Sequence, residues 1–270
     1  MNSTFTADEI KSYRENGFIV KNDFLTPAEL QEWRDAVDEA VAARKNRKLA
    51  NKEWEAGNDY YDNVFTQRLN LWMDNARMKK IMVDERLGKM AADLEGVDGM
   101  RIWHDQALIK EPWANPTAWH LDNPYWSYYS KNACSIWVAL DDATYDNGCL
   151  YFLPGSHKTA TFNNSGIGTN MADLFKIYPD WKTIKAVAAP MKAGSCSFHN
   201  GICAHGAHAN MTPGRRRAMT CGYMPEGSVF NGQKNVLPDD YFNSLKKGDV
   251  LDNDAQNPLL YSKTKKAVTA

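Results

Sequence analysis

Residues 134–156, CSIWVALDDATYDNGCLYFLPGS, contain two short apolar runs separated and followed by turn-forming residues. The runs Cys134–Leu140 and Cys149–Leu153 have the length and composition of β-strands. The segments Asp146-Asn147-Gly148 and Pro154-Gly155-Ser156 are typical of turns, because Asn, Gly and Pro favour the backbone angles that turns require. This stretch therefore predicts short strands joined by tight connections, as in an antiparallel β-structure.

The rest of the chain divides into a helical start and a β-rich middle. Capping boxes of the form Ser/Thr-x-x-Glu at Thr6 and Thr26 predict two helices, and further helices are expected between residues 75 and 95. More β-like runs follow, namely Arg101–Ile109, Trp119–Asp122, Ala186–Ala189, Gly194–His199 and Arg215–Met224. Helices first and many short strands later favour an antiparallel β-sandwich or barrel packed against helices.

The composition is that of an ordinary globular protein. The chain has 270 residues, of which 43% are hydrophobic and 24% are charged. A chain of this size can bury a core without disulfides or a structural metal. We expect one domain over residues 1–270, with a helical part at about 1–98, a β core at about 99–225 and a C-terminal extension at 226–270.

The charge balance and the cysteines argue against several kinds of partner and site. Lys and Arg number 32 and Asp and Glu 33, so the net charge of −1 provides no overall attraction to nucleic acid or anionic membranes. No apolar run is long enough for a transmembrane helix, and the polar N-terminus does not have the pattern of a secretory signal. The five cysteines show no Cys-x-x-Cys spacing, so neither a disulfide framework nor a zinc ribbon is predicted. We expect a cytoplasmic protein with no nucleic-acid or membrane partner.

A histidine and a carboxylate two residues apart suggest part of a metal site. On a strand, His120 and Asp122 would point to the same face, because side chains alternate with a period of two. Together they could supply two ligands of the 2-His-1-carboxylate triad that binds non-haem Fe(II), with the third ligand from elsewhere in the fold. A surface ion pair is the competing interpretation of this tripeptide taken alone.

Three histidines compete for the third ligand position. His199, His205 and His208 make up half of the six histidines in the chain, which favours metal binding in this segment. Arg216 follows eleven residues after His205, within a run of three arginines. A guanidinium near the metal would suit 2-oxoglutarate, because it can bind the carboxylate that does not chelate the iron. A solvated turn is the alternative interpretation of the arginine run.

Residues 101–224 resemble the phytanoyl-CoA dioxygenase family of Fe(II)- and 2-oxoglutarate-dependent oxygenases. The order and spacing of several blocks carry this resemblance, and residues 16–34 also resemble the opening segment of the family. The blocks are His104–Lys110, Pro116–Trp126, Trp137–Thr144, Asn147–Leu150, Leu153–His157, the pair His205-Gly206, and Arg216 followed by Ala218.

The resemblance implies a role for individual residues. It makes His120, Asp122 and His205 the iron ligands and Arg216 the residue that binds 2-oxoglutarate, with His199 and His208 left as supporting or structural groups. It also implies that Trp137, Thr117 and Gln106 lie at the cosubstrate site, with Lys110 on the same strand as Gln106. One departure is Ala207, where many relatives have a serine that can hydrogen bond to the cosubstrate.

The resemblance further implies a fold and a reaction. The expected fold is a double-stranded β-helix, the jelly-roll barrel, with the N-terminal helices packed on its major sheet. The expected reaction uses Fe(II), 2-oxoglutarate and O₂ to hydroxylate or otherwise oxidise a small molecule, with release of succinate and CO₂. The aromatic residues Tyr125–Tyr129 favour an apolar or ring-bearing substrate, and Thr159–Trp181 is a candidate lid over the site.

Alternative functions remain open at this stage. An acyl-CoA hydroxylase like the family's namesake would need a basic groove, for which Lys182, Lys185 and Lys192 are candidates. A non-catalytic jelly-roll would keep the metal site but only bind a ligand. A zinc or manganese protein of the cupin type would have no carboxylate for Arg216 to hold. The sequence leaves the oligomeric state undetermined.

Overall fold

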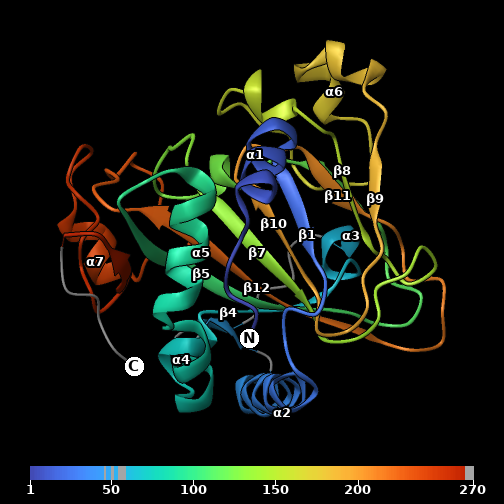
Figure 1. The fold of residues 1–270 in the computed structure, drawn as a ribbon, viewed down its shortest axis with the longest axis horizontal. Helices are drawn as coiled ribbons and strands as arrows, with labels where there is room; N and C mark the ends of the chain where they lie inside the picture. The colour runs from blue at the N-terminus through green and yellow to red at the C-terminus, as the bar shows by residue number, and fades with distance from the viewer. Residues whose placement is uncertain (46, 50–51, 54–58, 265–270) are drawn as a thin grey trace.

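The computed structural model describes residues 1–45, 47–49, 52–53 and 59–264, and its centre is a pair of antiparallel β-sheets (Figure 1). The strands of the large sheet lie in the order β1 (Phe18–Lys21), β10 (Cys196–Asn200), β7 (Cys134–Ala139), β12 (Arg216–Pro225), β5 (Gly99–Lys110) and β13 (Leu259–Ser262), with β4 (Thr66–Leu69) also paired to β5. The small sheet has the order β6 (Thr117–His120), β11 (His205–Ala207), β8 (Leu150–Phe152) and β9 (Val187–Ala189). A separate short hairpin joins β2 (Arg47–Leu49) to β3 (Lys52–Glu53).

Four N-terminal helices cover the outer face of the large sheet. These are α1 (Ala7–Asn16), α2 (Pro27–Arg44), α4 (Ala76–Met82) and α5 (Glu85–Glu95), and Figure 1 shows α5 lying across the sheet near β5. The predicted capping boxes at Thr6 and Thr26 are both present, and Asp84 caps the start of α5. The shorter helices are α3 (Asp59–Asp62), α6 (Leu174–Ile177) and α7 (Asp239–Ser244).

The alternation of side chains along the large sheet separates the core from the site. On β7, Ile136 and Val138 pack into the core cluster beneath the helices, whereas Ser135 and Trp137 point to the opposite face and line a cavity. His120 and His205, from the small sheet, line the same cavity. The cavity therefore lies between the two sheets, on the side away from the helices.

Strands from outside the central β-rich part also join the large sheet. The mainly helical N-terminal part contributes β1 and β4, and the C-terminal extension contributes β13, which pairs with β5. The strand expected at Trp119–Asp122 is instead Thr117–His120, so Asp122 lies beyond its end. Asp122 has helical backbone angles (φ −77°, ψ −53°) and begins a 3₁₀ turn over Asn123–Tyr125.

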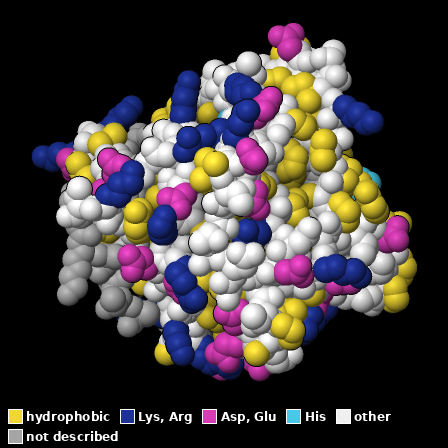
Figure 2. All heavy atoms as spheres, viewed as in Figure 1, with side chains coloured by type: hydrophobic (Ala, Val, Ile, Leu, Met, Phe, Trp, Pro, Cys, Tyr) yellow, Lys and Arg dark blue, Asp and Glu magenta, His cyan; other side chains and the backbone are white. Residues whose placement is uncertain are grey.

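Lys, Arg, Asp and Glu side chains are interspersed over the face shown in Figure 2. All five cysteines are buried and free, in agreement with the absence of a predicted disulfide framework. Among the residues that the structure describes, no helix has both the length and the hydropathy of a membrane span.

Candidate metal and cosubstrate site

Two histidines face each other across neighbouring strands. His120 on β6 and His205 on β11 are directly paired in the register, and their ring centroids are 4.2 Å apart. The Nδ1 atom of His120 is 2.9 Å from the carbonyl oxygen of Ala118, and Nδ1 of His205 is 3.0 Å from that of Cys203. A carbonyl can only accept, so each Nδ1 carries the proton and each Nε2 presents a lone pair to the cavity.

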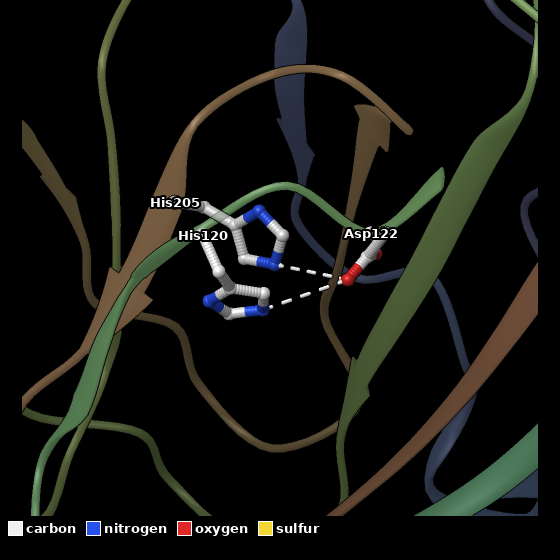
Figure 3. Close-up of side chains that lie close together, drawn as sticks. All are labelled: His120, Asp122 and His205. Atoms are coloured by element: carbon white, nitrogen blue, oxygen red, sulfur yellow. Dashed lines mark ion pairs between the residues drawn. The ribbon is translucent and has the colours of Figure 1, made fainter. Parts of the chain in front are cut away.

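Asp122 completes a group of three convergent side chains (Figure 3). Its Oδ1 atom lies 3.6 Å from Nε2 of His120 and 3.6 Å from Nε2 of His205. One donor atom from each of the three residues lies within 4.8 Å of the other two, a separation that a single metal ion can bridge. Two imidazoles and one carboxylate are the donor set of non-haem iron sites.

The second carboxylate oxygen of Asp122 is held by the large sheet. The Ser135 hydroxyl donates to Oδ2 over 2.7 Å, and Nε2 of His199 lies 3.0 Å from the same atom. The two oxygens are therefore differentiated: Oδ2 is engaged by β7 and β10, while Oδ1 faces His120 and His205. Such partners fix the orientation of a metal-binding carboxylate.

The electrostatics of the group favour the protonation states that a metal requires. Burial alone would raise the pKa of Asp122, but His205, His120 and His199 around it hold that pKa well below its usual range. Burial, with His120 and His199 nearby, holds the pKa of His205 well below its usual value. An ionised carboxylate and neutral imidazoles are the forms in which these side chains bind a metal.

Arg216 is a buried cation on the opposite wall of the cavity. It is only 2% exposed, and its Nε and Nη1 atoms have no hydrogen-bond partner. Its guanidinium carbon lies 5.0 Å from the centre of the Trp137 ring, and burial lowers the pKa of Arg216 to about 10. Its neighbours Arg215 and Arg217 point away and pair with acidic side chains, Asp38 for both and also Asp141 for Arg217. A buried guanidinium with unused donors is suited to an anionic ligand that enters the cavity.

The cavity that joins these groups has a volume of about 620 Å³. Thr117 and Gln106 line it together with Trp137, the metal group and Arg216, and Gln106 accepts a hydrogen bond from Gln67. Lys110 has a different environment, because its ammonium group donates to the backbone carbonyls of Val64 and Asn115.

Several cavity residues come from segments that carry no recognisable motif. These residues are Ser135, Tyr61, Phe65, Asn235 and Val236. Ser135 lies in an ordinary apolar strand, and only the spatial pairing of β7 with β10 places it beside Asp122. The candidate lid contributes Gly166 and Ile167 to the cavity wall.

Comparison with known protein families matches residues 13–218 to Phytanoyl-CoA dioxygenase (PhyH). The chain belongs to the phytanoyl-CoA dioxygenase family. Methylphosphonate hydroxylase of Gimesia maris is similar, with 24% identity over 243 residues that span 85% of each chain. The non-heme alpha ketoglutarate dependent carbocyclase SnoK from nogalamycin biosynthesis has a similar structure, with a TM-score of 0.80, 25% identity, and coverage of 95% of this chain and 97% of that chain.

A second solved structure is the epimerase SnoN in complex with Fe3+, alpha ketoglutarate and nogalamycin RO, which is 22% identical with a TM-score of 0.74 over 94% of this chain and 97% of that chain. These structural similarities confirm the predicted double-stranded β-helix. Family membership and structural similarity together identify the chain as an iron- and 2-oxoglutarate-dependent dioxygenase.

Proposed function

We propose that His120 and His205, through Nε2, and Asp122, through Oδ1, bind the iron of this dioxygenase. The convergence of these three atoms within 4.8 Å carries the proposal. The backbone carbonyls at Ala118 and Cys203 hold both rings in the tautomer that leaves Nε2 able to coordinate. Residues 1–270 would then act as one dioxygenase domain.

Arg216 binds the carboxylate of 2-oxoglutarate that does not chelate the metal. Its unpartnered Nε and Nη1 donors, buried between the sheets, support this assignment, because a carboxylate accepts two such bonds in parallel. Trp137 packs against the guanidinium and forms a flat wall for the cosubstrate chain. Thr117 and Gln106 contribute polar atoms to the same wall.

Iron and 2-oxoglutarate, when bound, would supply the chemistry in which O₂ oxidises a substrate C–H bond to C–OH while 2-oxoglutarate becomes succinate and CO₂. The chain orients both reactants and limits access of water. His120, Asp122 and His205 would hold the iron through three protein donors, and Arg216 would hold the cosubstrate beside it. Burial of the site strengthens its electrostatic interactions, because the surroundings have a low dielectric constant.

The walls of the cavity favour a ring-bearing small molecule as the substrate. Tyr61, Phe65, Tyr125 and Trp126 line the cavity, and aromatic side chains stack on planar or apolar ligands. The lysines considered for a CoA group do not support the acyl-CoA alternative. Lys192 is exposed and pairs with Asp142, and the described lining of the cavity includes neither it nor Lys182 or Lys185.

The test is to measure metal binding and turnover in matched histidine variants. In the absence of O₂, we expect the wild-type protein to bind Fe(II) together with 2-oxoglutarate, which is measured by the visible charge-transfer absorption of the chelate. When O₂ is added, we expect succinate to form. His120→Ala, Asp122→Ala and His205→Ala should abolish both signals.

His208→Ala is the matched control, because His208 is exposed and stacks on Tyr151 at 4.5 Å. Loss of iron binding in this control, or its retention in His205→Ala, would disprove the ligand assignment. Iron binding without any succinate would instead identify a ligand-binding module.

A further inference from the structure

The side chain of Asn164 is hydrogen-bonded to the residue between two proposed metal ligands. Its Oδ1 accepts from the backbone N–H of Leu121 over 3.1 Å, and its Nδ2 donates to the backbone carbonyl of Leu121 over 2.7 Å. Leu121 lies between His120 and Asp122. One amide side chain thus satisfies both backbone polar groups at this point of the chain.

This pair of bonds replaces a missing strand neighbour. β6 is the terminal strand of the small sheet and ends at His120. Among the described residues, no further strand of this sheet therefore pairs with the backbone of Leu121 on the open side of β6. In an antiparallel ladder a residue exchanges both its N–H and its C=O with one partner, and Asn164 reproduces that exchange. Asparagine is suited to this position because its amide has a donor and an acceptor side by side, whereas aspartate lacks the donor.

The loop that contains Asn164 is attached to the ligand segment at further points. Phe162 stacks on Tyr129 with ring centroids 4.7 Å apart. The Tyr125 hydroxyl donates to the carbonyl oxygen of Ser165 over 2.7 Å. The loop is therefore fastened on both sides of Asn164 to the segment that follows β6.

The same loop forms part of the cavity wall. Gly166 and Ile167 line the cavity two and three residues after Asn164. A Cβ atom at Gly166 or Gly168 would meet nothing within 4 Å, so neither glycine is closely packed against the rest of the protein. Movement of this tip away from the cavity would pull on the bonds between Asn164 and Leu121.

We propose that Asn164 is a positioning residue that couples the loop at 162–168 to the metal ligands His120 and Asp122. The inference rests on the proposed metal site. Closure of the loop holds the backbone of Leu121 in the conformation that directs both ligands into the cavity. By linkage, metal binding must in turn stabilise the closed loop, because coupling between two sites is reciprocal.

The experiment measures this coupling without requiring the substrate. Hydrogen exchange of residues 161–168 is followed without O₂, with and without Fe(II) and 2-oxoglutarate, together with the Fe(II) affinity. We expect metal to slow exchange of this loop in the wild-type protein. In Asn164→Ala and Asn164→Asp the slowing should be lost and the Fe(II) affinity should fall about tenfold, the effect typical of groups that orient metal ligands.

Asn163 provides the matched control, because it is the same residue type, is exposed, and the bonds it makes to Thr161 and Tyr178 use its backbone. Asn163→Ala should retain both the metal-induced slowing and the wild-type affinity. If both Asn164 variants retain the wild-type Fe(II) affinity and the metal-induced slowing of hydrogen exchange in the loop, the proposed coupling is wrong. A wild-type protein that binds no Fe(II) would overturn the proposed metal site itself, and the coupling with it.

Discussion

Replacement of Arg216 by methionine should separate the stability of the protein from its affinity for 2-oxoglutarate. The buried guanidinium makes no hydrogen bond to the protein through Nε or Nη1, and burial lowers the pKa of Arg216 to about 10. Burying a charge without hydrogen-bond partners is unfavourable. The free energy of unfolding of Arg216→Met without ligands should therefore be equal to or higher than that of the wild type.

The affinity for the cosubstrate should change in the opposite direction. A bidentate pair provides two charge-assisted hydrogen bonds, each contributing about 1.5–3 kcal/mol. Their loss costs about 3–6 kcal/mol, which corresponds to about 10²–10⁴-fold in the dissociation constant of 2-oxoglutarate. The stabilisation that 2-oxoglutarate adds to that of Fe(II) in the wild type should accordingly be largely lost in Arg216→Met, whereas the stabilisation by Fe(II) alone should remain.

The assay is thermal unfolding without ligand and with Fe(II) plus 2-oxoglutarate, together with anaerobic titration of the visible absorption of the chelate. Arg215→Gln is the control, because this side chain is 51% exposed and faces Asp38 rather than the cavity. A dissociation constant for Arg216→Met within about threefold of the wild type would refute the assignment of Arg216, because even one charge-assisted bond exceeds that effect.

Three further outcomes follow from individual contacts. His199→Ala removes one of the two hydrogen-bond donors to Oδ2 of Asp122. This variant should therefore bind Fe(II) about tenfold more weakly but retain turnover at saturating iron. A completely inactive variant would contradict this prediction. Gly206→Ala places a Cβ atom 2.8 Å from a backbone oxygen of β6, so calorimetry should show that the free energy of unfolding falls by about 1–3 kcal/mol. Gly214→Ala is the control, because the space around Gly214 is open and the free energy of unfolding should not change. Desolvation raises the pKa of Glu95 to about 7, so the folded wild type retains a proton that the unfolded chain releases, and its stability falls as the pH rises from about 4.5 through 7. In denaturant titrations, the free energy of unfolding of Glu95→Gln should therefore rise by about 2 kcal/mol relative to that of the wild type between pH 5 and pH 8. If the free energies of unfolding of the two proteins depend on pH in the same way, this linkage is excluded.

Local chemistry explains why much of the fold could be predicted from the sequence. The capping boxes at Thr6 and Thr26 depend on contacts within three residues, and the structure contains both of them. The seven short strands expected between turn residues are predicted for the same reason, and the structure contains each of them to within two residues of its predicted ends. The strand β13 could not be predicted in this way, because residues Leu259–Ser262 become a strand only through their pairing with β5.

The candidate site shows the limit of sequence patterns more clearly. The spacing of His120 and Asp122 suggested one strand face, but the strand ends at His120 and a 3₁₀ turn brings the carboxylate back toward the rings. Sequence spacing alone could not show whether His199 or His205 is the ligand, and in the structure both histidines lie near Asp122. The sheet register separates them: His205 is paired with His120 on the small sheet, whereas His199 approaches the other carboxylate oxygen from the large sheet.

Asp122 therefore connects the two sheets as well as belonging to the metal group. It follows β6 of the small sheet, while Ser135 and His199, its partners at Oδ2, belong to β7 and β10 of the large sheet. These two bonds fix the orientation of the carboxylate, so little ordering of the side chain remains for metal binding to impose. The same bonds make the distance between the sheets at this point depend on the carboxylate. The geometry of the proposed metal site and the packing of the barrel are thus determined by the same side chain.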